Sequence, residues 1–326
     1  MVVKTSIAHV RMADNPGAIQ KAKMYVWTRQ FHLAIDALNN AIFEQESVRE
    51  AKWLRANIYV LTGRFAAAKK DLKVLSRKRK WKPARGGSRA DVDRRAKDGE
   101  AKPVEQLQAS LAAAESAQNQ GMTAHAMGQM TKCMNSLTEA LKVAKASVFL
   151  HLLRAKAAYE LRMYSWIRHD TAVVLQSTDV EHSAEQLEAL QLLGEAQFDL
   201  LGQSAASLKN LRLCMRRDPG RTTGCDAAHA RISAVLDIDE KVRFATKAED
   251  WNAAIQFLIQ QLELDGTSAA ATEARAVLCG YYPKVQQGKY ADRAVKDCTA
   301  AIKLLDDKAD LFDQGECCDH QVNCVV

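Results

Sequence analysis

The chain has 326 residues, 48% of them hydrophobic, and its 46 Lys/Arg against 39 Asp/Glu give a formal charge of +7. Only 5 Pro and 15 Gly interrupt it, which favours a helical chain with short turns. No apolar run approaches the length of about 18 residues that a membrane span requires, and residues 1–20 lack the apolar core of a secretory signal. We therefore expect either a cytosolic protein or a chain whose natural amino terminus is missing.

Residues 1–17 show no periodicity, and we expect them to be disordered. Helical periodicity begins in 18–76. Phe31 and Phe65 are 34 residues apart, and each is followed by small and large apolar residues at helical spacing. After Phe31 these are Ala34, Leu38 and Ala41, and after Phe65 they are Ala68, Leu72 and Leu75. With Ala56, Tyr59 and a turn at Gly63, this is the tetratricopeptide (TPR) pattern, a helix–turn–helix unit of 34 residues. Two such repeats fill 18–76.

The positive charge is concentrated in the segment that follows. Residues 77–102 contain 11 Lys/Arg and 4 Asp/Glu, a balance of +7, so the rest of the chain is formally neutral. We expect 77–103 to be a charged linker or a helix extension, because runs of like charge are usually solvated. A nuclear signal or a phosphate-binding patch at 77–80 is the alternative. Trp81 alone provides no aromatic platform, so nucleic acid is not an expected partner.

Further repeats follow the charged segment. We assign repeats three to five to 104–219, repeats six and seven to 220–308, and a truncated eighth repeat with an irregular tail to 309–326. In the third repeat we place Leu107, Leu111 and Ala114 on the first helix and Gly121, Ala126, Met130 and Cys133 on the second. The first helix of the sixth repeat is expected to be long, from about Ala227 to Lys247. The predicted fold is an all-α superhelical solenoid of about seven TPR repeats.

Catalytic chemistry is not expected. The chain has no glycine-rich phosphate loop and no nucleophile turn, and we predict that it is not an enzyme and needs no cofactor. His169 and Asp170 are adjacent, so their side chains point to different helix faces, and we interpret both as solvated. Cys317, Cys318, His320 and Cys324 do not have the spacing of a familiar zinc site, so no metal is expected.

Two pairs of cysteines have spacings compatible with disulfides. Cys214 and Cys225 flank a Pro-Gly turn, and Cys279 and Cys298 fall on the two helices of one repeat. The alternative is that each is a small apolar residue at a tight helix contact, which is how we interpret Cys133.

The first helices of the repeats supply a candidate binding surface. Positions two, five, nine and twelve of a TPR unit face the concave side, and several hold apolar residues. We predict a groove for an extended or helical apolar segment, lined by Ile19, Val26, Trp53, Asn57, Val60, Leu152 and Tyr159. The alternative is that inserted helices or a neighbouring molecule cover these residues. Ile19, Trp53 and Leu152 are unsuitable for the clamp that grips the acidic C-termini of cytosolic chaperones.

Four strings carry a more specific resemblance: WLRANIYVLTGRFAAAKKDLKVL, HLLRAKAAYELRMYSWIRHDTAVVL, LKNLRLCMRRDPGRTTGC and AVKDCTAAIKLL. They resemble the TPR co-chaperones of the endoplasmic reticulum that carry a C-terminal J domain and are known as inhibitors of the interferon-induced eIF2α kinase. The resemblance covers about 18–312. It implies Cys214–Cys225 and Cys279–Cys298 disulfides and an oxidising lumen, with a cytoplasmic location as the alternative.

The same resemblance implies a function. The first three repeats would hold unfolded client polypeptides by apolar contacts, in support of Hsp70-type folding and the unfolded-protein response. The His-Pro-Asp tripeptide by which J domains stimulate Hsp70 does not occur in the chain, so Hsp70 would be engaged indirectly. The alternative is a TPR scaffold that regulates a folded partner, such as an eIF2α kinase.

Overall fold

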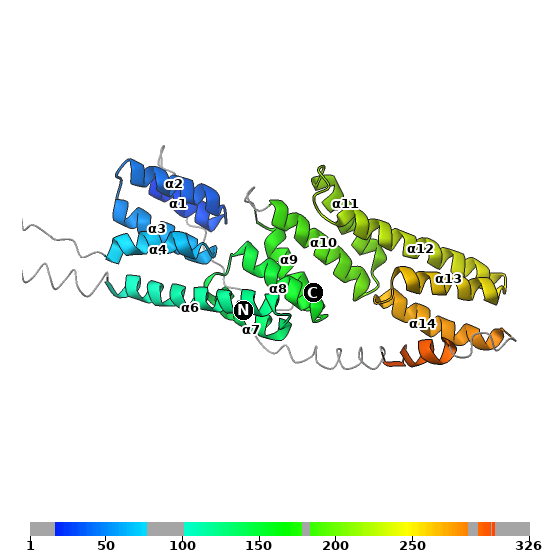
Figure 1. Cartoon of the computed structure of the whole chain (residues 1–326). Coiled ribbons are helices and arrows are strands. Elements are labelled where there is room, and N and C mark those ends of the chain that lie inside the picture. Colours follow the sequence, from blue (N-terminus) through cyan, green and yellow to red (C-terminus); the bar gives the residue numbers. More distant parts are fainter. Residues whose placement is uncertain (1–16, 77–100, 178–182, 286–292, 301, 304–326) are drawn as a thin grey trace, which may run out of the picture. The chain divides into compact units, whose positions relative to one another are not determined.

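The computed structural model describes residues 17–76, 101–177, 183–285, 293–300 and 302–303 (Figure 1). Within these ranges the regular elements are helices, and no strand occurs. None of the described helices is both long enough and apolar enough to cross a membrane. The predictions for 1–16, for most of the charged segment and for the cysteines of the tail lie outside these residues.

Helices follow one another in pairs joined by short turns. Their bounds are α1 Ala18–Trp27, α2 Phe31–Phe43, α3 Val48–Leu61, α4 Phe65–Ser76, α6 Ala101–Ala126, α7 Met130–Val143, α8 Val148–Glu160, α9 Tyr164–Leu175, α10 Ser183–Asp199, α11 Ser204–Arg217, α12 Cys225–Lys247, α13 Trp251–Leu264 and α14 Ala269–Tyr281, with a short 3₁₀ turn at Tyr282–Lys284. First helices pack against the second helices that follow them, as α1 does against α2, α8 against α9 and α12 against α13. In the fifth repeat, Gly194 of α10 lies against Leu211 of α11.

The turn between the two helices of a pair has the same conformation throughout the described repeats. Two residues before each second helix the backbone is left-handed, and glycine occupies that position at Gly63, Gly128 and Gly202, with φ of 76°, 71° and 66°. The equivalent turns before α2, α9 and α13 place Arg29, Arg162 and Glu249 in the left-handed region. Glycine adopts this conformation without steric cost, whereas the other three residues do so at some strain.

The chain divides into two structural units, residues 1–189 and 190–326. The division falls inside α10, within the range 104–219 that sequence analysis assigned to repeats three to five. The core of the first unit follows the 34-residue pattern. Every predicted packing residue of α2 and α4 is buried: Phe31, Ala34, Leu38, Ala41, Phe65, Ala68, Leu72 and Leu75. Ala56 on α3 is buried as well, which confirms the packing face derived from the sequence.

The third repeat differs from the prediction. Gly121 and Ala126 were expected on its second helix, but α6 extends without interruption from Ala101 to Ala126, and α7 begins only at Met130. Gly121 sits inside α6 because the helix approaches α7 closely there. A Cβ at this position would come within 2.7 Å of the Leu137 side chain. The glycine therefore marks a tight helix contact, not a turn.

In the second unit, α12 runs from Cys225 to Lys247 and confirms the long first helix predicted for the sixth repeat. One core cluster of the second unit is formed by α12, α13 and α14. Its buried residues include Ile238, Val242, Ile255, Leu258, Ala274 and Leu278. The seventh repeat continues in a helix over 293–300, while Tyr290 and Ala301 lie outside the described residues.

Candidate functional site

The seven predicted groove residues all lie on first helices of the first unit. Ile19 and Val26 are on α1, Trp53, Asn57 and Val60 on α3, and Leu152 and Tyr159 on α8. They divide into two groups by exposure. Ile19, Val60 and Leu152 are buried, and Val26, Trp53, Asn57 and Tyr159 are half-buried.

The buried group departs from the expectation of an open groove. Ile19 belongs to a core cluster with Ala34 and Leu38 of α2, so α1 turns this side chain toward its own partner helix. Leu152 packs in a cluster with Val174 of α9 and Ala189 of α10. Val60 is only 4% exposed. These three residues form part of the core, and a ligand could reach them only if the helices moved.

The half-buried group keeps part of its surface accessible to a ligand. Trp53 and Asn57 are one turn apart on α3, and the Asn57 side-chain amide donates to the Trp53 carbonyl at 2.7 Å. Val26 and Tyr159 occupy equivalent positions in the first and fourth repeats. A large aromatic side chain that keeps part of its area exposed can contribute substantial binding energy to an apolar partner. We therefore take Val26, Trp53 and Tyr159 as the candidate binding surface.

The lysines at groove positions are already paired with carboxylates. Lys23 on α1 bonds Glu50 on α3 at 2.9 Å, and Lys156 on α8 bonds Glu188 on α10 at 2.5 Å. All four side chains are nearly half exposed, so each pair contributes little to stability. Each glutamate nevertheless offsets the charge of its lysine, so the pair attracts the carboxylates of a ligand less than a lone lysine would.

An arginine contact recurs in the second and fourth repeats. Arg154 of α8 makes a two-pronged contact with Asp170 of α9 at 2.7 and 2.8 Å and donates to Thr138 of α7 at 3.0 Å. Arg55 of α3 bonds Asp71 of α4 in the same way and reaches back to Asn39 of α2. In both cases the partners lie 16 residues ahead and 16 residues behind. We call these two sets the arginine clamps. Each joins a repeat to the one before it.

Asp170 is the most buried member of the clamps, with no exposed surface, and the interpretation of this residue as solvated is wrong. His169 beside it is exposed, as expected of the opposite helix face. Burial alone would raise the pKa of Asp170, but hydrogen bonds from Arg154 and His151 outweigh it and lower the pKa. His151 places its Nδ1 2.7 Å from Asp170 and its Nε2 3.1 Å from the Lys145 carbonyl, so both ring nitrogens face acceptors.

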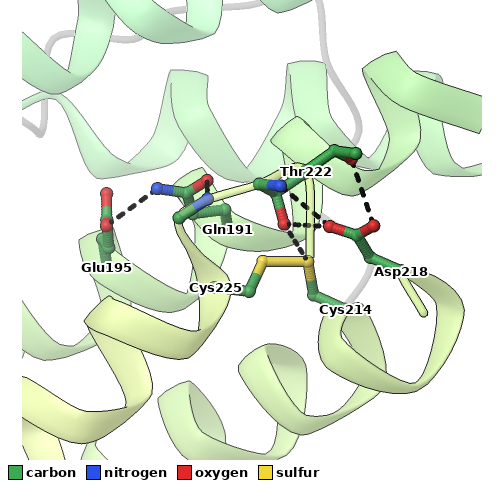
Figure 2. The surroundings of a disulfide bond; sticks show 8 residues. Gln191, Glu195, Cys214, Asp218, Thr222 and Cys225 are labelled. Carbon is green, nitrogen blue, oxygen red and sulfur yellow. Dashed lines mark hydrogen bonds between the residues drawn. A yellow bond between two sulfur atoms is a disulfide. The ribbon is translucent and has the colours of Figure 1, made fainter. Parts of the chain in front are cut away.

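The second unit contains both predicted disulfides. Cys214, near the end of α11, bonds Cys225, the first residue of α12, with the Cα atoms 6.3 Å apart (Figure 2). The turn between them is held by the Asp218 carboxylate, which accepts from the Thr223 backbone N–H at 2.8 Å and from the Thr222 hydroxyl at 3.1 Å. Backbone hydrogen bonds from these threonines lower the pKa of Asp218.

Gln191 of α10 also holds this turn: it accepts from the Gly224 N–H and donates to Glu195 (Figure 2). The second disulfide joins Cys279 of α14 to Cys298 in the helix over 293–300. Cys133 is a free thiol, fully buried in α7, as its interpretation as a small apolar residue predicted. Burial raises the pKa of this thiol. No group of His, Cys, Asp and Glu in the described part of the chain is arranged to hold a metal ion.

No family model matches the sequence, and no curated protein matches it either. Among solved structures, the chain is similar to the crystal structure of the TPR domain of P58(IPK), with a TM-score of 0.61 and 15% identity over 89% of this chain and 74% of that one. A second match is the TPR2AB domain of yeast Sti1 in its complex with pHSP90, with a TM-score of 0.31 and 16% identity over 66% of this chain and 97% of that one. The first similarity, with the paired helices, establishes an all-α TPR solenoid. The second is too low to bear on the fold.

Proposed function

We propose that the protein is a chaperone-like binding module that holds unfolded polypeptides on the surface formed by Val26, Trp53 and Tyr159. The observation that carries this proposal is Trp53, a half-buried indole on a first helix that keeps part of its area accessible. Exposed apolar area of this kind is what an unfolded segment, with its own apolar side chains in water, would cover.

The pairing of Lys23 and Lys156 supports an apolar ligand. A surface built to bind acidic peptides would keep its lysines available, whereas both of these lysines are held by glutamates of the following first helix. Binding would then depend on side-chain area more than on ligand charge, which suits a protein that accepts many unfolded sequences.

We further propose that the protein works in the oxidising lumen of the endoplasmic reticulum, alongside Hsp70 and within the unfolded-protein response. The two disulfides support an oxidising compartment, because such bonds seldom persist in the cytosol. Regulation of a folded partner such as an eIF2α kinase is the alternative, and the experiment below separates the two.

The test measures how well the full chain suppresses aggregation of a denatured model substrate. Trp53→Asp places a charge on the surface, and we expect the concentration needed for half-suppression to rise about tenfold, which corresponds to about 1.4 kcal/mol. Phe43→Asp is the matched control. It makes the same type of change at an aromatic residue that is 88% exposed but lies on a second helix, α2.

Two results would contradict the proposal. If Trp53→Asp, with unchanged helical circular dichroism, suppresses aggregation as well as wild type does, the surface is wrongly assigned. If wild type shows no suppression and instead forms a stoichiometric complex with a purified folded kinase, the scaffold function replaces the chaperone function.

A further inference from the structure

A second groove lies in the other unit, between α12 and α14 with α13 beneath. Its volume is about 460 Å³, within the range of ordinary ligand sites. The floor is apolar: Val242, Leu258 and Ala274 are buried there, and Val277 and Tyr281 are half-buried. A hydrogen bond of 2.9 Å between the hydroxyls of Thr246 and Tyr281 joins α12 to α14 along one side.

The charges of this groove are sorted along its length. Asp239 of α12 and Glu273 of α14 both line the groove, and their charges are close enough to repel each other. Arg243 and Lys247 follow Asp239 at intervals of four residues and line the groove toward the other end. Arg243 is close enough to Asp239 for its charge to favour the ionised carboxylate, and Lys247 lies one helical turn farther along α12. The two carboxylates thus mark the negative end of the groove and Lys247 marks the positive end, with Arg243 between them.

A buried amide beside the carboxylates is incompletely satisfied. Gln261 of α13 lines the groove and is only 2% exposed. Its side chain donates a hydrogen bond to Asp239, while its Oε1 has no partner among the described residues. An unpaired buried acceptor is costly in a folded protein and calls for a donor. Three acceptors, the two carboxylates and this amide oxygen, therefore gather at the negative end.

Burial of Asp239 and the nearby charge of Glu273 raise the pKa of Asp239, while Arg243 and the hydrogen bond from Gln261 oppose that rise. Two carboxylates that repel each other across a groove are relieved by a cation placed between them. A protonated amine or a guanidinium would also supply donors to the Gln261 oxygen.

The spacing of the charges defines the length of the ligand. Asp239 and Lys247 are eight residues apart on α12, which is about 12 Å along a helix. An extended chain advances about 3.3 to 3.6 Å per residue, so about three to four residues span that distance.

We propose that this groove binds an extended segment of another polypeptide, with a Lys or Arg between Asp239 and Glu273, an apolar residue on the floor, and an Asp or Glu near Lys247. The acidic residue lies four positions from the basic one, because alternate side chains of an extended chain share a face. This site goes beyond the function proposed above, because it lies in the other unit and selects its ligand by charge. The two sites can therefore fail independently.

The test uses the full chain and a fluorescein-labelled peptide with blocked ends, Lys-Ala-Leu-Ala-Glu, and binding is followed by fluorescence anisotropy. In an extended chain the Lys, Leu and Glu of this peptide lie on one face. Replacement of the peptide Lys by Met should weaken binding at least tenfold, because the charge-assisted hydrogen bonds are lost. Glu273→Gln and Asp239→Asn should each have an effect of similar size on the Lys peptide. Glu240→Gln is the matched control, since Glu240 is an exposed residue of the same helix that does not line this groove.

Several outcomes would overturn the proposal: no binding at millimolar peptide, equal binding of the Lys and Met peptides, or equal losses with Glu240→Gln and Glu273→Gln. Loss of peptide binding in Trp53→Asp would place the peptide on the first unit instead. Self-association that Glu273→Gln abolishes would show that a second copy fills the groove. Glu273 is exposed, so Glu273→Gln should not disturb folding. This variant therefore tests the site even if Asp239→Asn folds poorly.

Discussion

At the scale of single residues, the arginine clamp of the fourth repeat is the strongest polar feature of the first unit. Arg154 is 5% exposed and Asp170 is fully buried, so both charges have left water. That desolvation is offset because Arg154 donates three hydrogen bonds, while Asp170 accepts from both Arg154 and His151. The guanidinium also lies over the Trp166 ring at 4.7 Å.

We predict that Asp170→Asn lowers the free energy of unfolding by about 3 to 5 kcal/mol, because the substitution leaves a buried guanidinium without its counter-charge. Urea denaturation followed by circular dichroism measures this loss. Lys156→Gln, which removes one partner of an exposed pair, should cost less than about 1 kcal/mol. Equal effects of the two substitutions would mean that the clamp is solvated in solution.

The same carboxylate predicts a pH dependence. The pKa of Asp170 is lower in the folded protein than its unfolded value of about 3.9, so its contribution is complete above that value. The contribution is lost as the pH falls through the lower folded pKa, because the unfolded chain takes up the proton first. The stability difference between wild type and Asp170→Asn should therefore be constant near neutral pH and shrink below about pH 4. A difference that grows with acid would contradict the assignment.

The sequence indicates the helix face of a residue better than its depth. Trp53 and Tyr159 stay accessible as expected, whereas Ile19, Val60 and Leu152 are buried. Position within a repeat sets the direction in which a side chain leaves its helix, but neighbouring helices decide how much of it they cover. The burial of Asp170 is not predicted for a related reason: its partners Arg154 and His151 lie on another helix, α8. The spacing of 16 residues between Arg55 and Asp71, repeated between Arg154 and Asp170, is the signal that could have revealed the pair.

At the scale of elements, the glycines in the turns before the second helices share a backbone conformation but differ in what surrounds them. Gly63 and Gly128 both have positive φ, but their surroundings differ. A Cβ at Gly63 would come within 2.5 Å of the Ser147 hydroxyl, which caps the start of α8, whereas a Cβ at Gly128 would meet no atom within 4 Å.

We therefore predict that Gly128→Ala costs about 1 kcal/mol of unfolding free energy, the strain of a left-handed alanine. Gly63→Ala should cost clearly more, because the new methyl group also displaces the α8 cap. Thermal denaturation of the two variants side by side measures the difference. If Gly63→Ala costs no more than Gly128→Ala, the turn at Gly63 does not pack against α8 in solution.

The helices themselves could largely be predicted from the sequence, because the 34-residue spacing sets most of their starts and ends. The helix boundary of the third repeat could not be predicted, because Gly121 is compatible both with a turn and with a close contact between two helices. Gly121 has no proline nearby and lies where a turn is plausible, yet it serves the approach of α6 to Leu137. Only the partner helix distinguishes a glycine that bends the chain from one that makes room.

At the scale of the whole molecule, the two units differ in their covalent chemistry. Both disulfides join residues of the second unit, while the described part of the first unit contains only the free thiol of Cys133. The loops that the disulfides close span 11 and 19 residues. Loops of this size correspond to about 3 kcal/mol each by the chain-entropy model.

We predict that a reducing agent destabilises the second unit and leaves the first unchanged. Hydrogen exchange measured by mass spectrometry, with and without reductant, can follow peptides from α3 and α4 for the first unit and from α12 and α13 for the second. Faster exchange should be confined to α12 and α13. Unchanged exchange in α12 and α13 would mean that the disulfides do not form, and equal acceleration in both units would mean that the units unfold together.

The arginine clamps restrict where residues can be inserted into the chain. Each guanidinium bonds partners 16 residues on either side, so an insertion within either interval would shift a partner along its helix and out of reach. The clamps join the first repeat to the second and the third to the fourth, and neither spans the junction between the second and third. That junction is where the 24-residue stretch 77–100 separates α4 from α6. The clamps thus fix the chain length within 39–71 and 138–170, and they place no such limit on the junction between the second and third repeats.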